Sequence, residues 1–174
     1  MSRDMAEASK SPAIILIGMP GAGKSTIGAG LASARGLPLV DSDRLIEQNS
    51  GQTLQALLDN RGYIALRELE EQVLLAHNFA GQVVATGGSA VYSAVAMSHL
   101  KACGPCVFLD IPLAEIEARV QNFQDRGIAG PAGQSLAAVY AERLPLYQRY
   151  ADIVVDGRDL NEVQLLAAVQ ASLS

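Results

Sequence analysis

Residues 18–25 read Gly-Met-Pro-Gly-Ala-Gly-Lys-Ser and directly follow the apolar run at residues 13–17. They fill the pattern G-x-x-x-x-G-K-[ST], in which glycines let the backbone turn tightly and aim its N–H groups at phosphates. The run before the loop is strand-like, and the segment after it is helix-like, so the positive end of a helix faces the same anion. The pattern therefore predicts an α/β fold built around a nucleoside triphosphate site.

The loop residues have distinct expected roles. Contacts to the nucleotide are expected from Gly21, Ala22, Gly23, Lys24, Ser25 and Thr26. Lys24 is expected to reach the β- and γ-phosphates and to be essential for catalysis, and the Ser25 hydroxyl is expected to bind Mg²⁺. The chain contains only three lysines, so a chance match at this position is rare. The competing interpretation is a glycine-rich turn that binds no ligand.

Length and composition set the class of protein. The 174 residues suit a single domain spanning residues 1–174, with a loose polar tail at residues 1–11. A hydrophobic content of 49% with 18% charged residues indicates a globular chain. No uninterrupted apolar run reaches the length of a membrane span, so we expect no membrane partner.

The net charge limits the kinds of partner that the protein can bind, and the cysteine content indicates its cellular compartment. A net charge of −5 argues against a protein that binds nucleic acid by broad phosphate neutralisation. Two cysteines, Cys103 and Cys106, make no disulfide framework and suit a reducing cytoplasm. The tetrad Cys103-Gly104-Pro105-Cys106 has the spacing of a redox motif, but it precedes a strand and not a helix. We interpret it as a turn that enters a buried strand.

Short apolar runs alternate with longer segments of helical spacing. Runs typical of buried strands lie at residues 13–18, 37–40, 82–85, 106–109 and 153–155. Helical segments lie at residues 25–35, 61–79, 90–101, 113–121, 136–149 and 160–172. The alternation predicts a five-stranded parallel sheet covered by helices, with ligands at the carboxyl ends of the strands. The glycine-rich segment at residues 122–135 is expected to be a mobile lid, with a plain surface connection as the alternative.

Charged residues near the strand ends suggest the reaction. Asp41 and Asp43 directly follow the second strand, where one carboxylate near Mg²⁺ and one near an acceptor hydroxyl suit phosphoryl transfer. An N-cap followed by a solvated turn explains the same pair equally well. Arg67 and Arg143 lie in helical segments and, taken singly, fit surface arginines.

Seven segments of the chain, in order, resemble the shikimate kinase family, small kinases that move the γ-phosphate of ATP to a hydroxyl of a carboxylated ring. They are residues 18–26, residues 41–43, Arg67 with Glu70, residues 83–88, Arg119 with Arg126, residues 143–147 and residues 154–156. The resemblance runs from residue 14 to about residue 156. It implies a three-layer kinase fold with strand order 2-3-1-4-5 and a lid, ATP and Mg²⁺ as cosubstrate and cofactor, and shikimate as the favoured acceptor.

The resemblance also implies roles for the acidic and basic residues at matching positions. Asp43 would contact the acceptor hydroxyls and act as the base, while Asp41 would assist the Mg²⁺ shell through water. Arg67 and Arg143 would hold the substrate carboxylate. A guanidinium suits that role because it offers two parallel donors, which orient a carboxylate as well as attract it.

Further positions match the family motifs. Gly87 and Gly88 would let the backbone approach the substrate closely. Arg126 would be the catalytic lid arginine that closes on the transferring phosphate. Arg119 would stack on adenine, and Asp156 would begin the adenine-facing loop. A monomer is expected.

The chain departs from the family at four places. Ser89 stands where a third glycine is usual, and residues 126–129 read Arg-Gly-Ile-Ala in place of Arg-Pro-Leu-Leu. The stretch between Arg126 and Arg143 is slightly short. Leu58 and Leu66 stand where aromatic walls of the substrate pocket are common. These changes leave a related carboxylated polyol, or a sugar acid such as gluconate, as competing acceptors.

Two further interpretations of the sequence differ in class. A nucleotide-binding regulatory relative would bind ATP without transferring phosphate, as a lid that closes poorly would allow. A nucleoside monophosphate kinase would share the phosphate loop but act on AMP or CMP. The substrate that supports turnover distinguishes all of these interpretations.

Overall fold

The computed structural model describes residues 11–120, 128 and 130–174. Its five strands are β1 (Ile14–Ile17), β2 (Leu39–Asp41), β3 (Val83–Ala85), β4 (Cys106–Asp110) and β5 (Ile153–Asp156). They form one parallel sheet in the order β2-β3-β1-β4-β5. The predicted strand order is therefore confirmed.

The central strand, β1, is apolar throughout because both of its faces are covered. All four of its residues are buried, and Ile15 pairs in register with Val84 on one side and Cys106 on the other. Continuous apolar runs are typical of parallel strands that pack under helices on both faces. This strand ends where the phosphate-binding loop begins.

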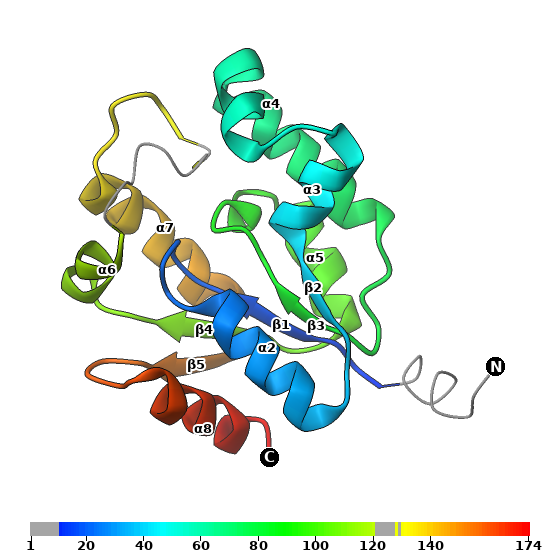
Figure 1. Ribbon diagram of the computed structural model, residues 1–174, viewed down its shortest axis with the longest axis vertical. Coiled ribbons are helices and arrows are strands. Elements are labelled where there is room, and N and C mark those ends of the chain that lie inside the picture. The colour runs from blue at the N-terminus through cyan, green and yellow to red at the C-terminus, as the bar shows by residue number, and fades with distance from the viewer. Residues whose placement is uncertain (1–10, 121–127, 129) are drawn as a thin grey trace.

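Seven α-helices and one 3₁₀ helix are described. They are α2 (Lys24–Arg35), α3 (Ser42–Ser50), α4 (Leu54–Ala76), η1 (Ala90–Tyr92), α5 (Ala94–Cys103), α6 (Leu113–Arg119), α7 (Leu136–Tyr150) and α8 (Glu162–Ser172). Figure 1 shows α2 and α8 on one face of the sheet, with α5 and α7 on the other. The three-layer α/β architecture predicted from the sequence is confirmed.

Two predicted helices differ from the observed ones. The segment expected to start at residue 61 begins at Leu54 as α4, because the Thr53 side chain caps it by accepting from the Ala56 N–H at 3.1 Å. Gly62 then interrupts it with φ 80° and ψ 169°. The segment expected at residues 90–101 is divided, because Ser93 ends η1 and caps α5.

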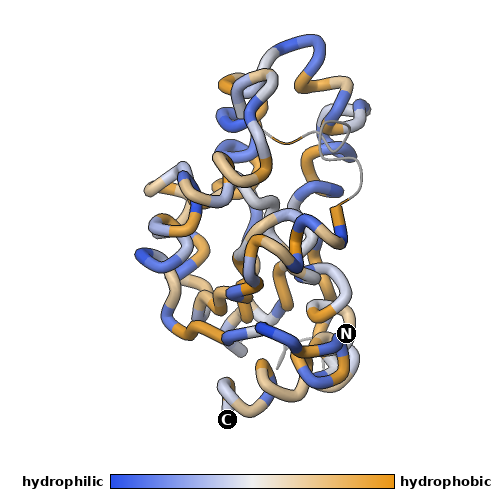
Figure 2. Tube along the Cα trace, turned by 90° about the vertical axis from the view of Figure 1, so that its left-hand side faces the viewer, coloured by the Kyte–Doolittle hydropathy of each residue, from blue (hydrophilic) through white to orange (hydrophobic). Residues whose placement is uncertain are grey.

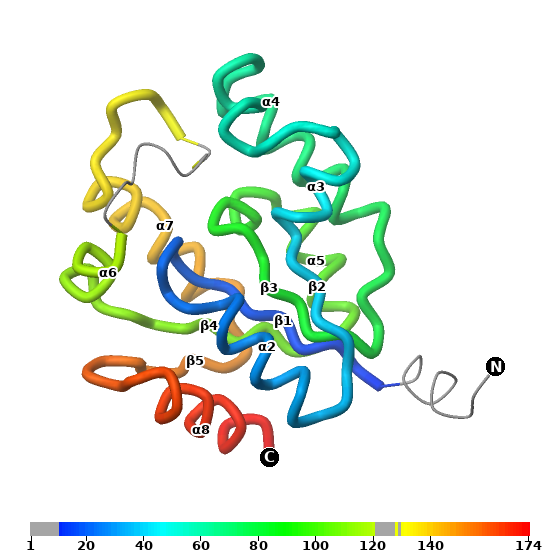
Figure 3. Tube along the Cα trace, in the orientation of Figure 1, coloured from blue at the N-terminus to red at the C-terminus, as the bar shows by residue number. Residues whose placement is uncertain are grey.

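Helix α3 was absent from the prediction. Its sequence is mostly polar, and few of its side chains are buried. Asp41 caps it, and α3 packs on α4 around a small apolar cluster of Ile46, Leu57, Leu66 and Val73. Figure 3 shows α3 and the first part of α4 extending from one end of the sheet, opposite the segment that leads into α7.

The main apolar core lies between the sheet and the helices of both outer layers. In Figure 2 the tube changes repeatedly between hydrophilic and hydrophobic residues along the helices, the pattern of amphipathic helices that bury one face. Within the part of the chain that the structure describes, no helix has both the length and the apolar character needed to cross a membrane.

The cysteine tetrad is a turn into a buried strand, as predicted. Cys103 ends α5 and Cys106 begins β4, and both thiols are free. A Cβ added to Gly104 would lie 1.9 Å from the Ala13 carbonyl oxygen, so the turn passes too close to β1 for any side chain. Burial raises the pKa of the Cys106 thiol, which is opposite to the change that activates a redox cysteine.

Candidate active site

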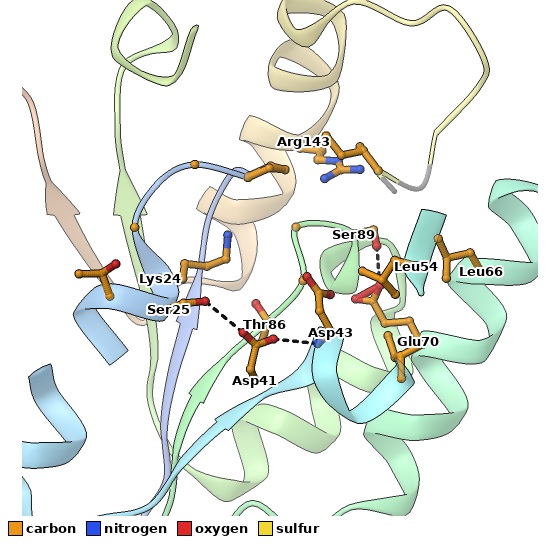
Figure 4. A pocket seen from close by; sticks show the side chains of 18 residues that line it. Lys24, Ser25, Asp41, Asp43, Leu54, Leu66, Glu70, Thr86, Ser89 and Arg143 are labelled. Carbon is orange, nitrogen blue, oxygen red and sulfur yellow. Dashed lines mark hydrogen bonds between the residues drawn. The ribbon is translucent and has the colours of Figure 1, made fainter. Parts of the chain in front are cut away.

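A cavity of about 450 Å³ opens at the carboxyl ends of β1, β2 and β3. This is the position where open parallel sheets bind ligands. Predicted site residues that line it are Gly21, Gly23, Lys24, Ser25, Thr26, Asp41, Asp43, Gly87, Gly88 and Arg143. Figure 4 shows side chains from both ends of the cavity pointing into the same space.

The loop between β1 and α2 adopts the backbone that its glycines allow. Gly21 and Gly23 have φ values of 81° and 95°, in the left-handed region that other residues rarely adopt. Gly23 is also the N-cap of α2, which has no side-chain cap. The first N–H groups of α2 are therefore left for an anion, as a helix N-terminus permits.

Lys24 crosses the inside of this loop. Its ammonium donates to the carbonyl oxygens of Gly18 at 2.6 Å and Met19 at 2.8 Å, and the residue is only 8% exposed. Burial lowers the pKa of Lys24 to about 8, although the nearby Asp43 carboxylate opposes the shift. A phosphate at the loop would supply the strong counter-charge that favours the protonated form.

Ser25 and Asp41 form an oxygen-rich pair beside the loop. The Ser25 hydroxyl donates to Asp41 Oδ2 at 3.1 Å, and Asp41 Oδ1 accepts from the Asp43 N–H at 3.0 Å (Figure 4). Asp41 is thus the N-cap of α3 and a neighbour of the phosphate loop at once. Hydroxyl and carboxylate oxygens are the ligands that Mg²⁺ prefers.

The oxygen atoms of Ser25 and Asp41 suit Mg²⁺ better than they suit a metal ion whose ligands all come from the protein. Among the described residues, no group of three or more histidine, cysteine, aspartate or glutamate side chains is placed to hold a metal. Mg²⁺ usually takes one or two protein ligands and completes its shell with water and substrate phosphates. Ser25 and Asp41 match that requirement.

Asp43 points into the cavity from the first turn of α3 (Figure 4). Burial first, and then the charge of Asp41, raise its pKa to about 6. A carboxyl group with a pKa near neutrality is suited to accept a proton in catalysis. The buried Ser42 hydroxyl accepts from the Gly87 N–H at 2.7 Å and so ties this turn to the end of β3.

Glu70 of α4 forms part of the same wall. Ser89 donates to Glu70 Oε2 at 2.5 Å, whereas Oε1 is buried without a hydrogen-bond partner among the described side chains. A Cβ on Gly87 would lie 3.3 Å from that oxygen, which places it beside the cavity. Burial raises the pKa of Glu70 to about 7, and the Ser89 hydrogen bond opposes the rise.

Arg143 of α7 enters the cavity from the opposite side and is 1% exposed. Its Nε donates to the Tyr92 hydroxyl at 3.3 Å. The Tyr147 hydroxyl donates to the Gly88 carbonyl at 2.7 Å, so this helix is fastened to the segment after β3. A buried guanidinium that faces a cavity is a strong candidate to bind an anionic group.

Arg67 lies in a neighbouring cavity of about 300 Å³ and does not line the larger one. Glu70 and Ser89 line both cavities, so they form the wall between them. The Arg67 guanidinium carbon lies 3.7 Å from the centroid of the Tyr92 ring. The two arginines predicted to act together are thus connected through Tyr92.

Several predicted residues lie elsewhere. Ala22 is fully buried in the loop and does not line the large cavity. Arg119 donates weakly to the Gly21 carbonyl at 3.4 Å, and Asp156 is exposed at the end of β5. Both lie outside the large cavity. Arg126 is outside the described residues, as is half of the predicted lid at residues 122–135.

The predicted apolar walls are half correct. Leu66 lines the large cavity, whereas Leu58 lines a small separate one with Ile128. Residues of the large cavity that received no cavity role from the sequence are Pro20, Ile46, Leu54, Thr86 and Ile128. Ile46 and Leu54 were missed because they belong to α3 and the first turn of α4, which the helical pattern did not indicate.

Known shikimate kinases are similar to this chain over most of its length. A family model described as "Shikimate kinase" matches residues 20–174. A shikimate kinase of Paracidovorax citrulli is 39% identical over 147 residues, covering 82% of this chain and 80% of the relative. One of Tolumonas auensis is 36% identical over 160 residues, covering 90% of this chain and 93% of the relative.

Solved structures agree with this result. The shikimate kinase of Acinetobacter baumannii in complex with shikimate has a TM-score of 0.85 and 28% identity, covering 97% of this chain and 96% of that one. A gluconokinase of Sinorhizobium meliloti has a TM-score of 0.51 at 18% identity, with coverages of 95% and 91%. The second likeness concerns the fold alone.

Proposed function

The chain belongs to the shikimate kinase family, and on this premise we propose that it transfers the γ-phosphate of ATP to the 3-hydroxyl of shikimate. The products are ADP and shikimate 3-phosphate. The observation that carries the proposal is that Lys24, Asp43 and Arg143 line the same cavity. A phosphate donor and an anionic acceptor need these groups to face one shared cavity.

The donor side is the loop of residues 18–25. The N–H groups of the loop and of α2 bind phosphate oxygens, and Lys24 exchanges its contacts with loop carbonyls for contacts with the β- and γ-phosphates. Ser25, and Asp41 through water, would hold Mg²⁺, and the ion would supply charge neutralisation to the phosphates. Little covalent chemistry is then left for the protein beyond positioning.

The acceptor side is built from Asp43, Arg143 and Arg67. Asp43 accepts the proton of the attacking hydroxyl, a role that its raised pKa permits. Arg143 binds the carboxylate of the acceptor through parallel donors and so fixes the ring relative to Asp43. Arg67 contributes to carboxylate binding from the adjoining cavity, across the wall made by Glu70 and Ser89.

The remaining roles rest on position in the family motifs. Arg126 closes on the transferring phosphate, and Arg119 and Asp156 contact the adenosine part of ATP. Arg119 lies next to Gly21, which supports a contact with the nucleotide. We further propose a single-domain monomer that acts in the cytoplasm without a nucleic-acid partner, in keeping with the negative charge and the free cysteines.

A panel of acceptors tests the proposal. ADP formation is followed with ATP, Mg²⁺ and one of shikimate, gluconate, AMP or CMP. We expect turnover with shikimate at least about 100-fold above the rate with any other acceptor, because a pocket built to bind a particular set of polar groups rejects analogues that leave them unpaired. Preferred turnover of gluconate or of a nucleoside monophosphate would contradict the proposal, as would ATP binding without turnover of any acceptor.

A further inference from the structure

We propose that Tyr92 is a positioning residue for the acceptor carboxylate, because it holds the guanidinium groups of Arg67 and Arg143 in a fixed relation to each other. This inference rests on the proposed function, in which the two arginines bind that carboxylate. Tyr92 ends η1, three residues after Ser89 and between the two arginine-bearing helices α4 and α7.

The Tyr92 ring contacts both guanidinium groups. The Arg67 guanidinium carbon lies 3.7 Å from the ring centroid, and that of Arg143 lies 5.3 Å from it. Both distances fall within the range of cation–π attraction, to which arginine is well suited because its plane also stacks on the ring. Tyr63 contacts only Arg67, at 5.0 Å. Among the described residues, Tyr92 is therefore the aromatic residue that contacts both guanidinium groups.

The Tyr92 hydroxyl adds a second connection. It accepts from Arg143 Nε at 3.3 Å and donates to Glu142 Oε1 at 2.6 Å. Glu142 Oε1 in turn lies 4.0 Å from an Arg67 terminal nitrogen. One phenol thus bridges a carboxylate and both cations, so its ring and its hydroxyl restrain the arginines independently.

A bridge of this kind meets a physical need. Two guanidinium groups that bind one carboxylate repel each other, and the repulsion is greatest where water is excluded, as around Arg143. A ring face and a carboxylate next to both groups offset that repulsion. The arginines are then held ready to bind, which lowers the entropy lost when the acceptor binds.

The position of Tyr92 limits what it affects. It lines the smaller cavity with Arg67 and is not a lining residue of the larger one, where the phosphate loop lies. Loss of Tyr92 should therefore weaken acceptor binding and leave nucleotide binding and the transfer step nearly unchanged. A purely structural residue would change stability or all kinetic constants together.

The test compares full-length wild type with Tyr92→Leu, Tyr92→Phe and the control Tyr150→Leu. Tyr150 also contacts an arginine, Arg149 at 5.5 Å, but lies outside both cavities. We expect Tyr92→Leu to raise the KM for shikimate about tenfold, with kcat and the KM for ATP within about twofold of wild type. Tyr92→Phe keeps the ring and should raise that KM about threefold, and Tyr150→Leu should not change it.

The methyl ester of shikimate provides the decisive contrast, because it lacks the negative charge. With the ester, kcat/KM of Tyr92→Leu should lie within about twofold of wild type. An unchanged KM for shikimate in both Tyr92 variants, or an equal loss of kcat/KM with shikimate and with its methyl ester, overturns the positioning role of Tyr92. Either result leaves the proposed function standing. If Tyr92→Leu does not fold, Tyr92→Phe decides by the same criteria. Absence of wild-type turnover with shikimate overturns the proposed function, and this role with it.

Discussion

Replacing Gly87 by alanine should slow phosphoryl transfer, whereas replacing the neighbouring Gly88 by alanine should weaken binding of the acceptor. A Cβ on Gly87 would lie 2.5 Å from Asp43 Oδ1, and a Cβ on Gly88 would lie 2.6 Å from Arg143 Nη1. Ordinary van der Waals contact begins at 3.4 Å, so each charged group must move by about 1 Å. Neither glycine has a positive φ value, so backbone strain plays no part.

The size of each effect follows from that displacement. Misplacing the base by about 1 Å should lower kcat of Gly87→Ala roughly 100-fold. Moving Arg143 weakens a charge-assisted hydrogen bond to the acceptor, worth about 1.5–3 kcal/mol, so Gly88→Ala should raise the KM for shikimate roughly 10- to 100-fold. Both clashes involve the ends of flexible side chains, although Gly88 also meets Pro20 at 3.0 Å.

Steady-state kinetics with ADP detection separates these outcomes, and thermal unfolding checks the fold. Both variants should melt within about 4 °C of wild type, and both should keep a near-normal KM for ATP. Equal changes in kcat and KM for the two variants would refute the assignment of Asp43 and Arg143 to separate tasks. Wild-type kinetics in either variant would refute the close approach of the charged side chain to that glycine.

Three further predictions concern charged groups. Lys24→Met should lower kcat at least about 1000-fold with the fold intact, measured by ADP release; activity within tenfold of wild type would contradict its role. The kcat/KM for shikimate should fall as the pH drops below about 6, because Asp43 must be deprotonated to act as the base; a profile flat to pH 5 would argue against Asp43. The pKa of Glu70 in the folded protein is raised from 4.5 to about 7, so the folded protein binds the Glu70 proton more tightly than the unfolded chain does. The free energy of unfolding therefore falls as the pH rises from 4.5 to about 7. Glu70→Gln should therefore match wild type in urea unfolding at pH 4.5 and exceed it by on the order of 3 kcal/mol at pH 8, whereas a less stable variant at pH 8 would identify Glu70 as a required charge partner.

The strands and the phosphate loop were predictable because their signals are local. A run such as residues 14–17 is apolar on both faces, and the spacing of Gly18, Gly23 and Lys24 by itself specifies the loop. The strand order is different in kind. It depends on long-range pairing, and it came from the resemblance to a family and not from periodicity.

Helix α3 and the first turns of α4 could not be predicted because tertiary packing stabilises them. Only Leu45 and Ile46 are apolar within residues 42–50, too few to show a helical period. The Asp41 cap and the small apolar cluster between α3 and α4 compensate. Tertiary packing commonly overrides weak local propensity in this way.

The site residues divide in the same way, into those that a local motif identifies and those that only tertiary packing brings together. Asp41, Asp43 and Arg143 were identified from motifs, and the structure brings them to one cavity. Ser89 was noticed only as a departure from the family pattern, and its bond to Glu70 depends on how η1 faces α4. The position of Tyr92 between two arginines carries no sequence signal, because the contacts join three separate elements.

Transfer of a labelled phosphate group from ATP to shikimate is the reaction that Lys24, Asp43 and Arg143 are proposed to carry out. The protein is incubated with shikimate, Mg²⁺ and ATP labelled in its γ-phosphate, and the products are separated and identified by mass spectrometry. We expect all of the label to appear in shikimate 3-phosphate, with one molecule formed for each ADP. Label found only in inorganic phosphate, or in a phosphorylated acceptor other than shikimate when a mixture is offered, would contradict it.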